Sequence, residues 1–230
     1  MSAIAIIIAR GGSKRIPRKN IREFCGSPII RYSIEAAISS KCFDEIMVST
    51  DDEEISRIAK SYGAKTPFTR SEKNSDDYAT TADVLIEVID RYKAIGKEFD
   101  NLCCIYPTAP FVSAGKLISA MEILQNNNDC DCVLPVVKYS YPIQRSLKIE
   151  NQRLKMNWPE NYSTRSQDLG DTYHDAGQFY CAKIADFLES KVLFTPETMP
   201  VIVSELEVQD IDSEEDWKIA EMKYKILNNG

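Results

Sequence analysis

Short apolar runs alternate with segments of helical period along most of the chain. Residues 4–9 (IAIIIA) form a continuous hydrophobic run of strand length, which is typical of a strand buried on both faces of a sheet. From about residue 28 to 39, isoleucines recur at every fourth position, which predicts an amphipathic helix. Further strands are expected at 45–49, 102–106, 132–137, 178–182 and about 201–208, and further helices from Asp51-Asp52 to Tyr62-Gly63, from about Thr81, at 117–124 and at about 213–227.

This order of elements predicts the fold class. Strands that alternate with helices form βαβ units, so we expect one α/β domain over residues 1–230, with a Rossmann-like, mostly parallel sheet flanked by helices. Ligands of such sheets bind beyond the carboxyl ends of the strands. The residues that directly follow each strand are therefore the candidates for function.

The hydrophobic pattern breaks between about residues 138 and 172. Prolines, asparagines, aromatic and charged residues mix there without a clear period. A structureless loop of this length is unusual in a compact domain. We therefore expect short strands or a small projecting arm in this segment, as an insertion that takes part in dimerisation or in the binding of a substrate.

Composition and charge exclude several classes of protein. The net charge of −7 is unfavourable for general nucleic-acid binding, which requires a basic surface. Seven cysteines without a C-x-x-C pair, together with a single histidine, argue against structural zinc and against a disulfide framework, so free thiols are expected. The first residues lack a basic segment followed by a long apolar one, so we expect a cytoplasmic protein without a membrane segment.

A basic loop follows the first predicted strand. Residues 10–20 (RGGSKRIPRKN) place five positive charges in an otherwise acidic protein. Glycines let the backbone approach an anion closely, and exposed N–H groups in such a turn form a concavity that binds it. We interpret the loop as a cradle for a triphosphate, although it is neither a P-loop nor a G-x-G-x-x-G motif. A solvated basic turn is the alternative.

Two carboxylates lie near the C-terminal end, in the sequence Gln209-Asp210-Ile211-Asp212. If this stretch is extended, the side chains of Asp210 and Asp212 point to the same side. Such a pair is a hard-oxygen site suited to Mg²⁺. The alternative is that Asp212 or Ser213 caps the final predicted helix.

Four motifs in order resemble those of one enzyme family. The segment ARGGSKRIPRKN closely resembles A-R-x-x-S-K-G-x-x-x-K-N, the N-terminal motif of the CMP-sialic acid synthetases, which are acylneuraminate cytidylyltransferases. Residues 70–81 (RSEKNSDDYATT), 106–110 (YPTAP) and 210–212 (DID) resemble three further motifs, so the resemblance covers essentially the whole chain. It implies a fold of nucleotidyltransferase type, a homodimer, and Mg²⁺-dependent transfer of CMP from CTP to the anomeric hydroxyl of a nonulosonic acid, with release of pyrophosphate.

Departures from the family pattern indicate the sugar. Arg15 stands where the sialic acid enzymes have glycine, Tyr106 stands where they have glutamine, and residues 175–180 read DAGQFY. These features resemble the pseudaminic acid cytidylyltransferase branch. The alternatives are the same reaction on N-acetylneuraminic or legionaminic acid, a sugar-1-phosphate nucleotidyltransferase, and a regulatory protein that binds CTP without turnover.

The resemblance also implies roles for single residues. It assigns Mg²⁺ to Asp210 and Asp212, and catalysis to these two together with Arg10 and Lys19. Arg145 and Arg165 would bind the sugar carboxylate through the guanidinium fork, with a surface ion pair as the alternative for each. The residues implied for CTP are Arg10, Gly11, Ser13, Lys14, Lys19, Asn20, Arg70, Ala79 and Thr81, and those implied for the sugar are Tyr106, Thr108, Arg145, Arg165, Tyr173, Gln178 and Phe179.

Overall fold

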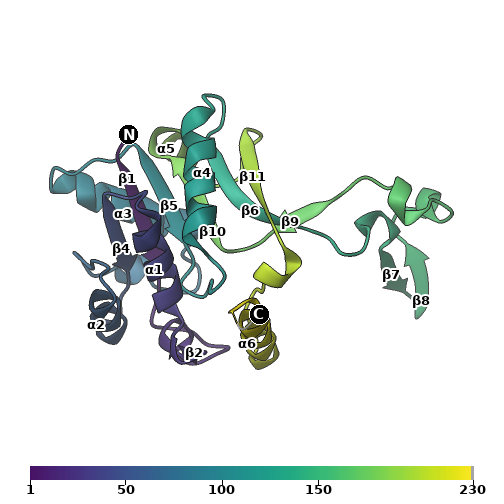
Figure 1. Cartoon of the computed structure of the whole chain (residues 1–230), viewed down its shortest axis with the longest axis horizontal. Helices are drawn as coiled ribbons and strands as arrows, with labels where there is room; N and C mark the ends of the chain where they lie inside the picture. The colour runs from purple at the N-terminus through teal and green to yellow at the C-terminus, as the bar shows by residue number, and fades with distance from the viewer. Residues whose placement is uncertain (229–230) are drawn as a thin grey trace.

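The computed structural model describes residues 1–228, and a mixed seven-stranded sheet forms its centre (Figure 1). The strand order is β11-β6-β10-β5-β1-β4, with β9 paired to β6 outside this path. β1 is parallel to β4 and β5, and β6 is parallel to β11, whereas β9 and β10 are antiparallel to their neighbours. The strands are β1 (Ala3–Ile8), β4 (Glu45–Ser49), β5 (Asn101–Ile105), β6 (Cys132–Lys138), β9 (Tyr173–Asp175), β10 (Phe179–Lys183) and β11 (Thr198–Val203). The predicted α/β class is confirmed, and β4, β1 and β5 form a parallel core, but β9 and β10 make the sheet mixed rather than mostly parallel.

Helices cover both faces of the sheet. On one face, Ala3, Ala5 and Ile7 of β1 pack in a core with α1, α2 and α4, and on the other face Ile4 and Ile6 pack with α3 and α5. Because both faces are buried, the first strand carries no polar position, which explains its continuous apolar run. The helices are α1 (Ile30–Ser40), α2 (Glu53–Ser61), α3 (Thr81–Ala94), α4 (Ala114–Asn126), α5 (Ile184–Ser190) and α6 (Glu214–Asn228). None of the helices in residues 1–228 has the length and apolar character of a membrane span.

Local polar contacts fix several helix boundaries. The Asp52 side chain accepts hydrogen bonds from the backbone of Glu54 and Ile55, and it thereby caps α2. Thr80 and Asp83 form a capping box at the start of α3. The prediction of a strand at about 201–208 was wrong in its bounds, because Ser204 and Glu207 form another capping box around the short 3-10 helix η6 (Glu205–Glu207), which ends β11 at Val203.

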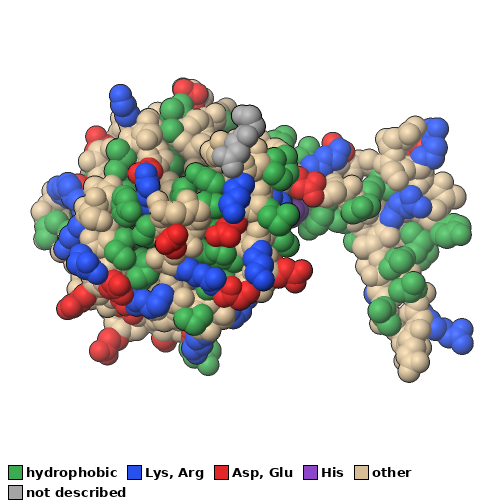
Figure 2. Space-filling view, turned by 60° about the horizontal axis from the view of Figure 1, so that its bottom comes forward, with side chains coloured by type: hydrophobic (Ala, Val, Ile, Leu, Met, Phe, Trp, Pro, Cys, Tyr) green, Lys and Arg blue, Asp and Glu red, His purple; other side chains and the backbone are tan. Residues whose placement is uncertain are grey.

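Residues between β6 and β9 leave the body as a projecting arm (Figure 1). The arm consists of short 3-10 turns and a hairpin of β7 (Leu147–Glu150) and β8 (Arg153–Met156). The space-filling view in Figure 2 shows hydrophobic side chains on its surface, and Ile149 of the hairpin is 75% exposed. The segment lacks a hydrophobic period because the arm that it forms has no core of its own to pack against.

Candidate functional site

A cavity of about 310 Å³ lies at the carboxyl ends of β1 and β5. Its wall combines the basic loop after β1, the segment between β4 and α3, and the turn after β5. This is the edge of the sheet where the order of elements predicted a ligand. The predicted site residues that line it are Arg10, Ser13, Lys14, Lys19, Asn20, Arg70, Ala79, Thr81, Tyr106 and Thr108.

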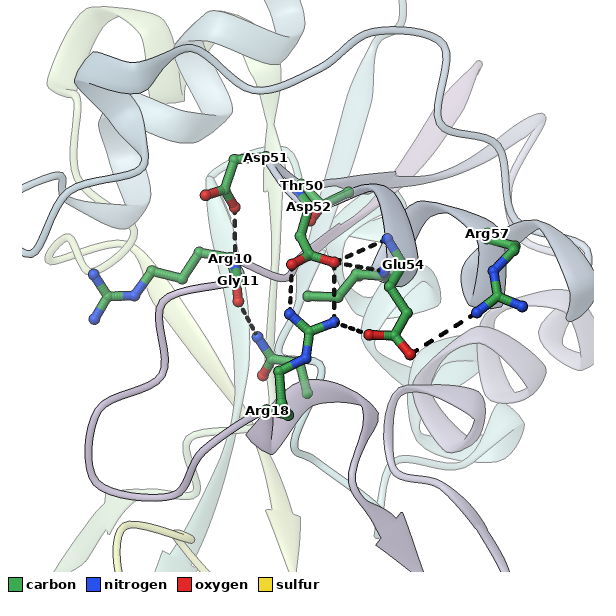
Figure 3. Close-up of polar contacts among 10 residues, drawn as sticks. Arg10, Gly11, Arg18, Thr50, Asp51, Asp52, Glu54 and Arg57 are labelled. Carbon is green, nitrogen blue, oxygen red and sulfur yellow. Dashed lines mark hydrogen bonds and ion pairs between the residues drawn. The ribbon is translucent and has the colours of Figure 1, made fainter.

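The basic loop is fixed to the start of α2 (Figure 3). The Gly11 amide donates to Asp51 Oδ1 at 2.8 Å, and the Arg18 guanidinium donates to both oxygens of Asp52 at 2.5 and 3.1 Å and to Glu54 at 2.5 Å. The hydrogen bond from Arg18 holds the pKa of Asp52 below its ordinary value. Arg18 is therefore an anchor that does not line the cavity, and this corrects the interpretation of all five charges as the cradle.

Two further predicted residues also hold the loop in shape. Asn20 is buried, and its Nδ2 donates to the Arg10 carbonyl at 2.8 Å. Lys19 Nζ donates to the Ile211 carbonyl at 2.6 Å and lies 3.6 Å from Asp212 Oδ1. Lys19 therefore links the basic loop to the segment that carries the two predicted metal ligands.

That segment has the alternation expected of an extended chain. Ile211 is buried among Ile16, Phe24 and Trp217, whereas Asp210 is exposed and Asp212 is half-buried. Both carboxylates therefore project away from the apolar contact, and Asp212 Oδ1 lies 2.8 Å from Arg15 Nη2. The capping alternative applies instead to Ser213 and Asp216, whose side chains bond to each other's backbone amides.

The donor chemistry of this pair fits Mg²⁺. The ion is bound in proteins through one or two carboxylates, and phosphate oxygens and water supply its other ligands. In residues 1–228 no cluster of three or more Asp, Glu, His or Cys side chains could hold a metal by itself. Asp210 and Asp212 are therefore suited to a metal that arrives with a phosphate ligand rather than to a closed protein site.

Arg70 supplies a buried cation beside the cavity. It is 8% exposed, its Nε donates to Ser49 Oγ at 3.0 Å, and its Nη2 donates to the Ser49 carbonyl at 2.5 Å. Burial lowers the pKa of Arg70 to about 10, so the guanidinium remains charged at neutral pH. Thr81 Oγ1 lies 3.4 Å from Tyr106 Oη on the same wall. These groups offer donors and acceptors to a planar polar ring.

The carboxylate of Asp175 is linked to Tyr106 through Tyr180. The Tyr180 ring packs edge-on against Tyr106, and Tyr180 Oη donates to Asp175 Oδ2 at 2.5 Å. The Gly177 amide donates to Asp175 Oδ1 at 2.7 Å, so both carboxylate oxygens are held. Burial and the Asp175 carboxylate raise the pKa of Tyr180, which keeps the phenol protonated as a donor. Asp175 opens the segment DAGQFY that indicates the sugar, but the resemblance implies no role for its side chain.

Several predicted sugar contacts lie outside the cavity wall. Phe179 is completely buried in the core, so its prediction as a sugar contact is corrected to a packing role. Gln178 is also buried, and its Nε2 donates to the Glu207 carbonyl at 2.5 Å, which supports the segment before Asp210. Tyr173 lies on β9, 40% exposed.

The two arginines predicted for the sugar carboxylate lie in the arm. Arg145 Nη1 donates to Ser166 Oγ at 3.2 Å, and Arg165 forms a two-pronged ion pair with Asp168 at 2.7 and 3.2 Å. Within one chain Arg165 therefore matches the alternative of a surface ion pair, whereas the partner of Arg145 is a hydroxyl. Gly11 likewise does not line the cavity, but it sets the path of the loop.

Gly11→Ala is expected to weaken the binding of CTP. An added Cβ would lie 2.9 Å from Asp52 Oδ2 and 3.0 Å from Asp52 Cβ, so the loop would have to move away from its anchor. We expect at least a roughly tenfold loss of affinity by calorimetry, because a displacement of this order misplaces the cations. Gly12→Ala is the matched control, since nothing lies within 4 Å of its added Cβ. Equal affinities of the two variants would contradict the role of this close approach.

Comparison with known proteins gives consistent results. A family model described as cytidylyltransferase matches residues 4–196. The chain is 42% identical over 228 residues to pseudaminic acid cytidylyltransferase of Campylobacter jejuni, with 98% of this chain and 97% of that protein covered. It is 31% identical to CMP-N,N'-diacetyllegionaminic acid synthase of Legionella pneumophila, with 96% and 95% covered. It is 29% identical to N-acylneuraminate cytidylyltransferase of Escherichia coli, with 94% and 51% covered.

Solved structures extend the likeness to the fold. The chain matches CMP:2-keto-3-deoxy-manno-octonic acid synthetase with a TM-score of 0.71 and 16% identity, and each chain is fully covered. It matches 4-diphosphocytidyl-2C-methyl-D-erythritol synthase of Anaerococcus prevotii with a TM-score of 0.63 and 16% identity, with 97% and 98% covered. At this identity the likeness concerns the fold, whereas the family match and the near-full-length relatives decide the family. The chain belongs to the cytidylyltransferase family.

Proposed function

We propose that this protein transfers CMP from CTP to the anomeric hydroxyl of pseudaminic acid and releases pyrophosphate. The observation that carries the proposal is the cavity in which Arg10, Lys14 and Lys19 converge, in a chain 42% identical over nearly its full length to an enzyme named for that sugar. The relatives named for legionaminic and N-acylneuraminic acid are less similar, at 31% and 29%.

The proposed reaction needs positioning and charge neutralisation more than covalent chemistry. The sugar hydroxyl attacks the α-phosphorus of CTP, a new oxygen–phosphorus bond forms, the bond to pyrophosphate breaks, and the hydroxyl proton is lost. Arg10 and Lys14 line the cavity and can neutralise the charge that develops on the leaving group. We further propose that Arg70 and Thr81, which line the same cavity, orient the base end of the nucleotide. No protein nucleophile is required.

For the metal, we propose that Asp210 and Asp212 hold Mg²⁺ beside the phosphates. Support comes from the projection of both carboxylates away from Ile211 and from the contact of Asp212 with Lys19 and Arg15, two residues of the cavity wall. When bound, Mg²⁺ would neutralise phosphate charge and lower the barrier to displacement.

The seven cysteines are free thiols, which fits a reducing compartment, and we therefore propose a cytoplasmic location.

The assembly proposed is a homodimer formed through the arm. Leu147, Ile149 and Leu154 of the hairpin are 55%, 75% and 67% exposed, and they belong to none of the hydrophobic cores formed by residues 1–228. Exposed apolar side chains grouped on one small element are typical of an interface. A second copy of the chain would bury them.

Sugar discrimination tests the function directly. Purified protein, CTP and Mg²⁺ are incubated with pseudaminic acid or N-acetylneuraminic acid, and released pyrophosphate is measured. We expect release with pseudaminic acid and at least a roughly tenfold lower kcat/KM with the other sugar, because a pocket built for different substituents leaves polar groups unpaired. Release with N-acetylneuraminic acid alone would keep the reaction and overturn the sugar. Binding of CTP with no release for either sugar would favour a regulatory protein.

The same assay tests the metal proposal. Chelation is expected to abolish pyrophosphate release, and Asp212→Asn is expected to lower kcat by roughly 100-fold or more, because the variant loses a charged ligand at the phosphates. Asp171→Asn is the control, since Asp171 pairs with Lys138 in the arm. Activity that survives chelation, or an Asp212→Asn variant as active as the control, would contradict the assignment.

Light scattering after size exclusion tests the dimer. The double change Ile149→Asp and Leu154→Asp is expected to convert a dimer to a monomer, because buried carboxylates at the interface would be unpaired. Ile95→Asp is the control, since Ile95 is 62% exposed on the body of the protein. A wild-type monomer, or a double variant that remains dimeric, would rule out assembly through the hairpin.

A further inference from the structure

Two cations of the phosphate cradle are already paired with a carboxylate that lines the same cavity. Arg10 Nη1 donates to Asp77 Oδ1 at 2.9 Å and to the Asp76 carbonyl at 2.8 Å, and Lys14 Nζ donates to Asp77 Oδ2. Hydrogen bonds from Lys14 and Arg10 lower the pKa of Asp77 from its ordinary value. In the free protein, Asp77 thus stands where the resemblance to the family places phosphate oxygens.

A tight turn presents this carboxylate to the cations. The Asp76 side chain accepts hydrogen bonds from the amides of Tyr78 and Ala79, and the capping box of Thr80 and Asp83 fixes the start of α3 directly afterwards. Asp77 itself takes part in neither arrangement, and within residues 1–228 its carboxylate bonds to Arg10 and Lys14. Its carboxylate is therefore not needed for the turn or for the cap.

The ion pairs of Asp77 with Arg10 and Lys14 are weak enough for another anion to replace Asp77. The Asp77 side chain is 41% exposed and that of Lys14 is 77% exposed, and ion pairs this accessible to water are weak. A polyphosphate offers several charged oxygens to the same cations, whereas Asp77 offers one carboxylate. Polyphosphate can therefore displace Asp77, whereas a ligand without phosphate would form no ion pair with Arg10 and Lys14 by displacing it.

On this basis we propose that Asp77 is an internal competitor of the phosphates: it occupies Arg10 and Lys14 in the free enzyme, and CTP binds by displacing it. The proposal rests on the proposed function, because it concerns how tightly the same cavity holds its nucleotide. The free energy of phosphate binding is then the difference between the pairing of the cations with phosphate and their pairing with Asp77. This competition lowers the affinity for every polyphosphate and leaves the binding of the base unchanged. After transfer, Asp77 pairs with the cations again as pyrophosphate leaves.

Removal of the Asp77 charge tests this directly. Calorimetry measures the binding of CTP and of pyrophosphate to the full-length protein, and competition measures that of cytidine. We expect Asp77→Asn to bind CTP and pyrophosphate roughly three- to tenfold more tightly, since it removes a competitor of about the strength of one or two exposed ion pairs. Cytidine binding should stay unchanged, and Asp77→Glu, which keeps the charge, should remain within about twofold of wild type.

Asp76→Asn is the matched control, because it removes the same charge one residue away while its side-chain oxygen can still accept from Tyr78 and Ala79. Tightening confined to Asp77→Asn supports the proposal. Equal tightening in both variants would reduce the effect to general electrostatics, and weaker or unchanged binding in Asp77→Asn would make Asp77 an orienting or neutral residue. Either result overturns the proposal while the proposed function stands. A wild-type protein that binds neither CTP nor pyrophosphate would overturn the proposed function as well.

Discussion

The anchoring of the basic loop to the start of α2 is the contact on which the rest of the site depends. Positive charges concentrated in one short loop repel one another, so the loop requires a fixed partner to hold a defined shape. Arg18 supplies it through its two-pronged bond to Asp52, and the Gly11 amide supplies a second contact through Asp51. Asp52 also caps α2. A single carboxylate therefore ties the end of β4, the start of a helix and the loop after β1 to one another.

This arrangement follows from the sheet. β1 and β4 are adjacent and parallel, with Ile8 opposite Ser49, so the segments that follow them leave the sheet side by side. Parallel pairing thus brings Gly11 and Asp51 together without any special feature of either residue. The close approach then leaves no space for a Cβ at position 11, while position 12 remains open. This contact therefore requires glycine at position 11 and not at position 12.

A second constraint joins the two ends of the chain. Ile16 and Phe24, which follow β1, pack with Ile211, which precedes α6, and with Trp217 of α6. Lys19 reaches the Ile211 carbonyl across 192 positions of sequence. Burial of Ile211 turns Asp210 and Asp212 outward, and Asp212 contacts Arg15 and Lys19. Hydrophobic packing and the hydrogen bond from Lys19 together therefore hold this segment beside the basic loop.

Sequence predicted the parts of the site that local pattern controls and missed those that depend on pairing between distant segments. The apolar period located β1 and β4, and the glycines and charges located the loop between strand and helix. The pattern of β10 indicates a strand but not its direction, so the antiparallel insertion of β10 between β5 and β6 was not foreseen. Phe179 was assigned to the sugar from its place in a motif, whereas the alternation of the strand turns it into the core. Asp77 was overlooked because its partners lie more than 60 positions earlier.

The balance of charge explains why the cradle can exist in an acidic protein. The chain carries −7 in total, so its overall field repels a triphosphate, and only a local excess of cations can attract one. Such an excess would be self-repelling in the free protein unless anions offset it. Asp77 does this for Arg10 and Lys14, and Asp212 does it for Arg15 and Lys19. These carboxylates come from two segments that are far apart in the sequence, 76–77 and 210–212, and both remain accessible to water. Arg18 and Asp52, outside the cavity, hold the loop independently of these pairings.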